Sequence, residues 1–283
     1  MLLSSASLSF FTLFAKFAIE SFSYFFLIFL RFGVPLVLLI PYLLYSTSMK
    51  KLFLLSNFKM QFLRCACLLI YQYSIFYYLM HSSLLDATVM QNTAPLFMPI
   101  LEWLFFKHRF EKKVVLSILI SFVGVLCILK PDKAIFANLS VAGFLVPLGQ
   151  AGSQVLYSHQ AKKENQTSNL FYLFFLCSII SAVIFLFSRQ FFGATLVLEH
   201  PLTWLWMNII CLGLTSILNQ LFRGEAYKHG KASALAPFLY FSMILSAVLD
   251  WAIFHYLPSW LSLIGAILVI AGGWIQIYKR NPS

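Results

Sequence analysis

The sequence predicts an all-α integral membrane protein whose ten transmembrane helices form two inverted five-helix repeats. Three observations predict this class: the composition, ten apolar runs of membrane-spanning length, and a motif that recurs after five of these runs. Of the 283 residues, 61% are hydrophobic and 10% are charged, whereas soluble domains average about 45–50% apolar and about 25% charged residues. So few charges could not cover a soluble domain, which leaves a bundle of helices in a lipid bilayer.

The ten apolar runs each have the roughly 17–25 residues that a helix needs to cross a bilayer. The first starts at Leu2 with no basic segment before it and no clear small-residue cleavage site, so we expect it to be retained as a helix. The connections between runs are too short to hold a soluble domain. The runs span residues 2–19, 24–46, 62–80, 87–106, 114–130, 140–158, 169–188, 203–222, 232–254 and 258–278.

The basic residues are distributed unevenly over the predicted loops. Lys130, Lys133 and Arg189 lie on the side opposite the N-terminus, and Lys16 and Arg31 lie within helices. Because bases concentrate in cytoplasmic loops, we expect a multi-pass protein of the bacterial cytoplasmic (inner) membrane with both termini in the cytoplasm. The net charge of +11 is then a topology signal, and no nucleic-acid partner is expected. The fifteen bases on the N-terminal side are Lys50, Lys51, Lys59, Arg64, Lys107, Arg109, Lys112, Lys113, Lys162, Lys163, Arg223, Lys228, Lys231, Lys279 and Arg280.

An internal repeat is marked by an acid followed by a tryptophan inside two apolar runs. The acids Glu102 and Asp250 are 148 positions apart. The same spacing separates Trp103 from Trp251, Phe106 from Phe254, and Gly124 from Gly272. Residues 1–132 and 133–283 are therefore expected to form one repeat each. Because five crossings are an odd number, the second repeat would enter the membrane inverted, a common plan in secondary transporters.

Several stretches resemble one family of carriers. "APLFMPILEWLFFKHRFEKKVVLSILISFVGVLCILKP" and "ASALAPFLYFSMILSAVLDWAIFHYLPSWLSLIGAILVIAGG" are similar to the fourth–fifth and ninth–tenth helices of EamA-type carriers in the drug/metabolite transporter superfamily. "FLRFGVPLVLLIPY" resembles their second helix, and Lys16 falls where many members carry a lysine late in the first helix. The resemblance implies a carrier of small organic metabolites that is driven by gradients and not by ATP. Its members move amino acids, amines, nucleotide-like metabolites such as S-adenosylmethionine, or sugar-linked lipids.

The sequence also departs from this family pattern. Members often end the fourth and ninth helices with Gly-Glu, which would fall at Lys107–His108 and His255–Tyr256. Both pairs are missing, so a family role for the later acid does not carry over to Glu102 and Asp250, six residues earlier.

Four charged residues in the predicted helices are candidates for charge pairing or gating: Lys16, Arg31, Glu102 and Asp250. Glu102 and Asp250 each lie about one turn before a helix C-terminus, where the helix dipole disfavours an acid. Each could instead reach the nearby interface or make a structural hydrogen bond. Arg31 lies deeper, and an intramembrane arginine is a candidate functional residue. An ion pair with Asp250 that only fixes packing is the alternative.

The candidate substrate-binding residues are Arg31, Tyr71, Asn92, Gln150, Gln154, Tyr157 and Tyr240. Gln150, Gln154 and Tyr157 recur at i, i+4 and i+7, which puts them on one helix face. That stripe favours a cavity lining, with interhelical hydrogen bonding as the alternative. Asn219 and Arg223 share a face near one helix end, and Phe174 is expected to face lipid.

We expect a secondary transporter of a small organic metabolite, amino-acid-like and zwitterionic or anionic, with S-adenosylmethionine-like molecules included. If Asp250 balances one of Lys16 and Arg31, one positive charge remains near the site, and a carboxylate or phosphate would complete the balance. A membrane scaffold or assembly protein and an intramembrane enzyme are the alternatives, and a homodimer stays open. No HExxH, Walker A or Gly-x-Ser-x-Gly motif occurs, and the five cysteines have no metal-ligand spacing, so no enzyme activity, metal or cofactor is expected.

The charge distribution generates a topology prediction. Single cysteines at Lys112 and Lys163 should react with a membrane-impermeant thiol reagent only from the cytoplasmic side, because both positions lie in predicted loops that are rich in lysine and arginine. A cysteine at Lys133 should react only from outside. Labelling at Lys112 from outside would overturn this orientation.

Overall fold

The computed structural model describes residues 1–19, 22–46, 57–81, 91–107, 112–129, 141–192, 202–254 and 260–278. Within these ranges every secondary-structure element is a helix. The elements are α1 (Leu2–Ile19), α2 (Tyr24–Ser46), α4 (Phe58–His81), α6 (Ala94–Phe106), α7 (Lys112–Leu129), α9 (Val141–Gln160), α10 (Gln166–Phe192), α11 (Leu202–His229), α12 (Ala232–Leu235), the 3₁₀ helix η1 (Ala236–Tyr240), α13 (Phe241–Phe254) and α14 (Trp260–Tyr278). Each predicted run thus contains a helix.

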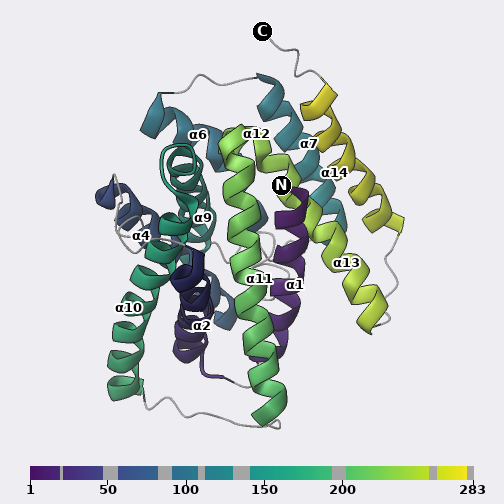
Figure 1. The fold of residues 1–283 in the computed structure, drawn as a ribbon. Helices are drawn as coiled ribbons and strands as arrows, with labels where there is room; N and C mark the ends of the chain where they lie inside the picture. Colours follow the sequence, from purple (N-terminus) through teal and green to yellow (C-terminus); the bar gives the residue numbers. More distant parts are fainter. Residues whose placement is uncertain are drawn as a thin grey trace.

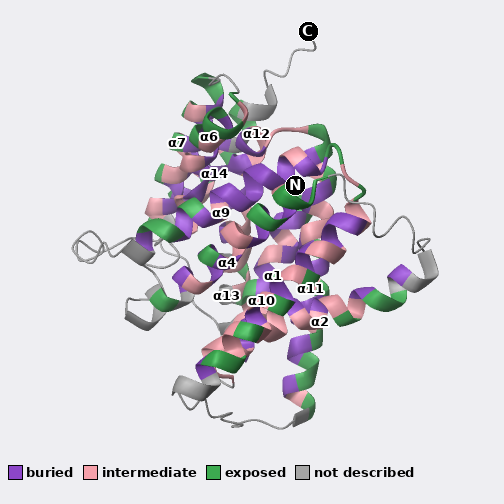
Figure 2. Ribbon diagram, turned by 90° about the vertical axis from the view of Figure 1, so that its left-hand side faces the viewer, coloured by how far each residue is buried: buried purple, intermediate pink, exposed green. Residues whose placement is uncertain are grey.

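The helices form one bundle, and α1 begins at the same end at which α14 finishes (Figure 1). Among the described residues, three helices are long and apolar enough to cross a membrane, over Tyr24–Pro41, Gln166–Ser188 and Thr203–His229. Buried residues concentrate where the helices pack together (Figure 2). Large apolar side chains such as Leu186 and Ile267 remain more than half exposed. An outer surface of this kind suits lipid.

The predicted run 232–254 is not one continuous α-helix. It is divided into α12, η1 and α13. Pro237 explains the division, because proline has no N–H to donate to the carbonyl of Ser233. The N–H of Ala236 bonds to that carbonyl instead, which tightens the chain into a 3₁₀ turn.

The end of α6 adopts a backbone conformation that usually belongs to glycine. Lys107 has φ 52° and ψ 28°, in the left-handed region, and its N–H bonds back to the carbonyl of Trp103 at 2.9 Å. This is the position at which the family pattern has glycine. The helix therefore ends there by a left-handed cap, although a lysine side chain disfavours that conformation.

Four pairs of helices make the most extensive contacts: α7 with α14, α4 with α9, α1 with α11, and α2 with α10. In addition, α6 packs on α9, and α13 packs on α1. Each of these pairs joins one helix before residue 130 to one after residue 140, so the two halves of the chain are interleaved.

The α7–α14 pair crosses closely at two glycines. A Cβ on Gly124 would lie 2.6 Å from the carbonyl oxygen of Gly265, and a Cβ on Gly272 would lie 2.9 Å from that of Ser117. The hydroxyl of Ser117 also donates to the carbonyl of Gly272 at 2.5 Å. Small residues at these positions let the two backbones approach, as in other membrane helix pairs.

A pair of alanine substitutions tests the importance of this crossing. Gly124→Ala should lower the stability by about 1–3 kcal/mol, because the new methyl group would overlap backbone atoms that cannot rotate away. Gly33→Ala is the matched control: its Cβ would meet the Ser178 hydroxyl at 3.5 Å and the Phe29 ring at 3.7 Å, which are ordinary van der Waals contacts, so the helix should gain or keep stability. Thermal unfolding in detergent measures both, and equal melting temperatures would contradict the argument.

Candidate functional site

A polar cavity lies inside the helix bundle. Its volume is about 60 Å³, which exceeds the space that one water needs but is well below the roughly 300–1,000 Å³ of typical ligand sites. The lining comes from α1, α2, α4, α9 and α11 and from the residues before α6. It comprises Leu8, Phe11, Arg31, Arg64, Leu68, Tyr71, Gln91, Gln150, Ser153, Gln154, Tyr157, Ser216, Asn219, Gln220 and Arg223.

Arg31 contributes to this cavity from the second turn of α2. Its guanidinium carbon lies 4.3 Å from the centre of the Phe11 ring on α1. An aromatic face attracts a cation weakly, and more strongly when both are removed from water. Phe11 therefore orients the guanidinium without neutralising it.

Arg64 is held more completely than Arg31. It is 1% exposed, and its guanidinium carbon lies 3.5 Å above the ring of Tyr157. Its Nη1 donates to Asn169 Oδ1 at 2.6 Å and its Nη2 to Gln220 Oε1 at 3.3 Å. All three partners are uncharged, and Arg64 Nε has no hydrogen-bond partner among the described residues.

Arg223 adds a third guanidinium from α11. It is 8% exposed, and its Nε is also buried without a partner among the described residues. No aspartate or glutamate occurs among the described residues that line the cavity. The site thus contains three arginines. The sequence analysis predicted only one unbalanced positive charge near the site.

On sequence grounds, Arg64 and Arg223 were counted with the bases of the N-terminal side and were not among the candidate binding residues. Arg64 and Arg223 lie inside α4 and α11 and face the cavity. Without them, thirteen of the fifteen bases remain on the N-terminal side against three opposite, so the bias that predicts the topology persists. Their positions within two turns of a helix end gave them the sequence context of loop charges.

The stripe on α9 lines the cavity as a unit, with Gln150, Gln154 and Tyr157 all on its wall. Tyr227 donates to Gln154 Oε1 at 2.7 Å, and Tyr157 donates to the carbonyl of Gln220 at 2.8 Å. Gln150 Oε1 and Gln154 Nε2 are buried without partners among the described residues. These atoms offer one free acceptor and one free donor.

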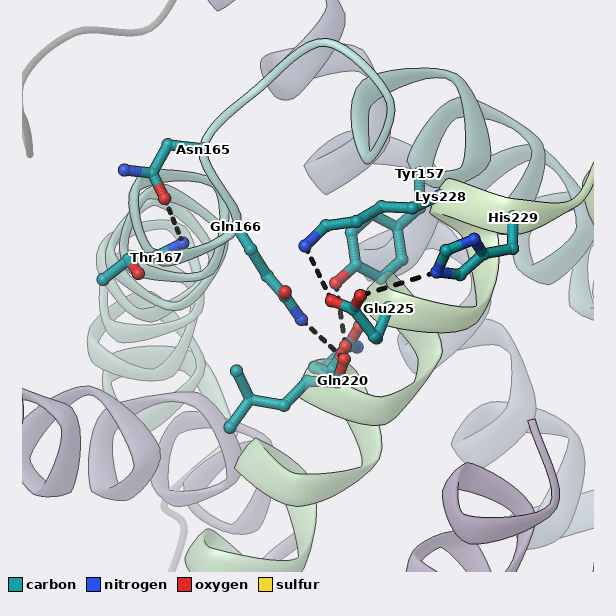
Figure 3. A network of polar contacts seen from close by, with 9 residues as sticks. Tyr157, Asn165, Gln166, Thr167, Gln220, Glu225, Lys228 and His229 are labelled. Carbon is teal, nitrogen blue, oxygen red and sulfur yellow. Dashed lines mark hydrogen bonds and ion pairs between the residues drawn. The ribbon is translucent and has the colours of Figure 1, made fainter.

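Tyr157 is fixed by a network of polar contacts at the end of α9 (Figure 3). The hydroxyl of Tyr157 and the amide of Gln166 donate to adjacent carbonyls of α11, at Gln220 and Leu221. One turn further along α11, Glu225 accepts from Lys228 at 2.6 Å. The network connects α9, α10 and α11 beside the cavity.

The remaining predicted site residues divide into three groups. Tyr71 lines the cavity with the α9 stripe. Asn92 is not part of the lining, and Tyr240 is buried with Val125, Met243 and Val269 in a separate apolar cluster. The side chains of Lys16 and Asp250 lie outside what the structure describes.

Glu102 lies in α6, where its side chain contacts the start of α12 and does not line the cavity. Its carboxylate accepts the N–H of Ser233 at 3.0 Å and also the hydroxyl of Ser233. Ser233 is in the first turn of α12, where the N–H groups have no partner within the helix. An acid at a helix start is favoured by the dipole. Glu102 therefore makes a structural hydrogen bond, which the sequence left open beside an interfacial position and a role in charge pairing or gating.

Comparisons with known proteins find a matching family and a matching fold. The model of the EamA-like transporter family matches residues 1–130 and 139–277. A solved crystal structure has the same fold, with a TM-score of 0.81 and 17% identity over 99% of this chain and 98% of its own.

Several characterised relatives share about a quarter of the sequence. The pseudopaline exporter of Pseudomonas aeruginosa is 25% identical over 71% of this chain and 68% of its own length. The riboflavin transporter of Brucella anthropi is 24% identical over 73% and 72%. The S-adenosylmethionine uptake transporter of Rickettsia bellii is 25% identical over 90% and 84%.

The α9 stripe generates a prediction about transport. Gln154→Ala should lower the initial rate of metabolite uptake into membrane vesicles about threefold to tenfold, because the cavity loses a free N–H donor and the partner of Tyr227. The protein level in the membrane should stay near normal.

Its control must be a residue that faces lipid. Phe174, expected on sequence grounds to do so, is 1% exposed and belongs to an apolar core, so that expectation is wrong. Leu186 on the same helix is 63% exposed, and Leu186→Ala should transport normally. If Gln154→Ala also transports normally, the stripe serves packing alone.

Proposed function

The chain belongs to the EamA-like transporter family, and from that premise we propose that it is a secondary transporter of a small organic metabolite that carries an acidic group. The observation that carries this proposal is the arginine-lined cavity inside a bundle with an apolar exterior. A charged side chain inside a membrane costs about 2.5–3.5 kcal/mol on insertion scales. Three such side chains around one cavity need a compensating gain, which an acidic substrate supplies.

Arg31 is proposed to bind the acidic group of the substrate. A guanidinium donates two parallel N–H bonds to a carboxylate or phosphate, and such paired bonds are stronger than neutral hydrogen bonds. Gln150 and Gln154 would fix the remaining polar groups through their free acceptor and donor. Tyr71 and Tyr157 would contribute flat apolar walls, which suit an organic ligand better than a bare ion.

The size of the cavity supports transport by alternating access. At about 60 Å³, the cavity has to widen before it can admit a metabolite. Its walls belong to both halves of the chain: α1, α2 and α4 come from the first, and α9 and α11 from the second. A relative movement of the halves would therefore open the cavity directly.

The packing pattern supports an inverted-repeat arrangement of these halves. If α1, α2, α4, α6 and α7 are matched in order with α9, α10, α11, α12–α13 and α14, the pair α4–α9 exchanges with α11–α1. The pair α6–α9 likewise exchanges with α13–α1, while α2–α10 and α7–α14 map onto themselves. A two-fold relation between the halves would produce this pattern.

The α7–α14 crossing supports the same arrangement at the level of single residues. Gly124 faces Gly265, and Gly272 faces Ser117. Gly124 and Gly272 are 148 positions apart, and so are Ser117 and Gly265. The shift that relates the two repeats therefore also exchanges the two contacts.

The cavity favours a transporter over the two alternatives. A scaffold or assembly protein would have no need of buried arginines around an internal cavity. An intramembrane enzyme would require a reactive pair of side chains, and the hydrogen bonds from Ser233 already occupy Glu102.

The proposed function is tested with the purified chain in proteoliposomes that contain no ATP. We expect a gradient-driven uptake of at least one acid-bearing metabolite from a labelled panel of amino acids, amines and S-adenosylmethionine. Arg31→Ala should slow this uptake at least about tenfold, since a hydrogen bond to a charged group contributes about 1.5–3 kcal/mol. Arg31→Lys should transport at a rate between those of the wild type and Arg31→Ala. Lysine keeps the positive charge but cannot donate two parallel N–H bonds to one acidic group.

Lys112→Ala, at the exposed start of α7, is the control and should transport like the wild type. The proposal fails if Arg31→Ala is as active as the wild type. It also fails if the transported metabolite is a cation without an acidic group.

A further inference from the structure

The cavity contains more positive charge than one acidic group can balance. Arg31, Arg64 and Arg223 line it, and none of the described lining residues is an acid. A zwitterion brings one carboxylate together with a cation, and a simple acid brings one negative charge. Either substrate would leave buried guanidinium groups without a counter-charge, which is strongly unfavourable in a membrane interior.

The three arginines reach the cavity beside different partners. The Arg31 guanidinium lies against the Phe11 ring of α1, at 4.3 Å from its centre. The Arg64 guanidinium lies against the Tyr157 ring of α9, at 3.5 Å from its centre. Arg64 Nη2 donates to Gln220 Oε1 on α11 at 3.3 Å, and Gln220 lies one helical turn before Arg223. Arg64 and Arg223 therefore meet at the α4–α11 contact, whereas Arg31 enters the cavity from α2 beside α1.

The Arg64–Arg223 pair has the features of a built site. Both side chains are more than nine-tenths buried, and Nε of each is an unpartnered donor among the described residues. Asn169, Gln220 and Tyr157 hold the Arg64 guanidinium in one orientation through two hydrogen bonds and a ring contact. These partners are neutral, so they position the charge and leave it available to an anion.

On the basis of the proposed function, we infer that Arg64 and Arg223 form a second anion subsite, and that the transported metabolite carries two acidic groups. One acidic group binds Arg31 and the other binds the Arg64–Arg223 pair. The shared chemistry of the second group is that of a carboxylate or a phosphate, both of which match the guanidinium fork. The substrate class is thus a dicarboxylate or a phosphorylated acid, narrower than the zwitterions and single acids that Arg31 alone would accept.

Matched pairs of probes test this inference on the purified full chain in detergent. The pairs are succinate with succinamate, and 3-phosphoglycerate with glycerate, at equal ionic strength. In each pair, the two molecules share a carbon skeleton and differ in the number of acidic groups. The readout is the concentration of probe that half-maximally raises the melting temperature. At least one two-acid probe should bind ten times more tightly than its single-acid partner, and the pair that responds distinguishes carboxylate from phosphate.

Variants of the second subsite should remove this preference. Arg223→Gln should weaken the two-acid probe about tenfold and leave the single-acid probe nearly unchanged. Arg64→Lys, which retains the charge and is less disruptive than removing Arg64, should weaken it partly. The control is Lys228→Gln, a cation on α11 that is paired with Glu225 and does not line the cavity. It should bind both probes like the wild type.

The outcomes separate this inference from the proposed function. Equal binding within both pairs, or no binding by any of the four probes, overturns the second subsite. Proteoliposome transport of a single-acid metabolite that is insensitive to Arg223→Gln also overturns it, while transport itself stands. Conversely, tight binding of a two-acid probe supports the subsite even if no metabolite of any class is transported in proteoliposomes, and that absence of transport contradicts the proposed function alone.

Discussion

The burial of the Arg64 guanidinium is the constraint that organises the centre of this bundle. A cation removed from water needs fixed dipoles around it, and here they come from three other helices: Tyr157 on α9, Asn169 on α10 and Gln220 on α11. Gln61, one turn before Arg64, donates to the carbonyl of Asn169 at 3.0 Å and fixes the same junction. The positions of α4, α9, α10 and α11 relative to one another therefore depend on one charged side chain. The shape of the cavity wall therefore depends on how these helices pack around the buried guanidinium.

Glu102 meets the same requirement with the opposite sign of charge. Its carboxylate is 5% exposed and is stabilised by the backbone N–H and hydroxyl of Ser233 at the start of α12. That start exists because Lys231 is extended, with φ −76° and ψ 156°, so the chain enters a new helix there. The acid that interrupts an apolar run thus supports a helix beginning on a distant segment of the chain. Asp250, its equivalent in sequence, lies in α13 at the same distance from the helix end, four residues before Phe254 as Glu102 is four before Phe106.

The fold was more predictable from the sequence than the site. Hydropathy located the long helices of the described ranges, because each lies in an apolar run, and the i, i+4, i+7 spacing found the α9 stripe. Arg64 was missed because a base near a helix end looks like a loop base, and only the packing of α10 and α11 shows that it is covered. Phe174 was assigned to lipid because its helix is apolar on nearly every side, so the sequence contains no signal for the buried face. The break at Pro237 had a local signal in the proline itself.

The close crossing of α7 and α14 has a mechanical consequence. Neither helix contributes a described residue to the cavity lining, which comes from α1, α2, α4, α9, α11 and the segment before α6. In Figure 1 the pair stands at one side of the bundle, beside α13. Because α7 belongs to the first half of the chain and α14 to the second, a relative movement of the halves that opens the cavity would have to turn about the glycine contacts of this pair. A backbone approach this close at Gly124 and Gly272 leaves little room for the two helices to slide past each other, so this side of the bundle would serve as the hinge of such a movement.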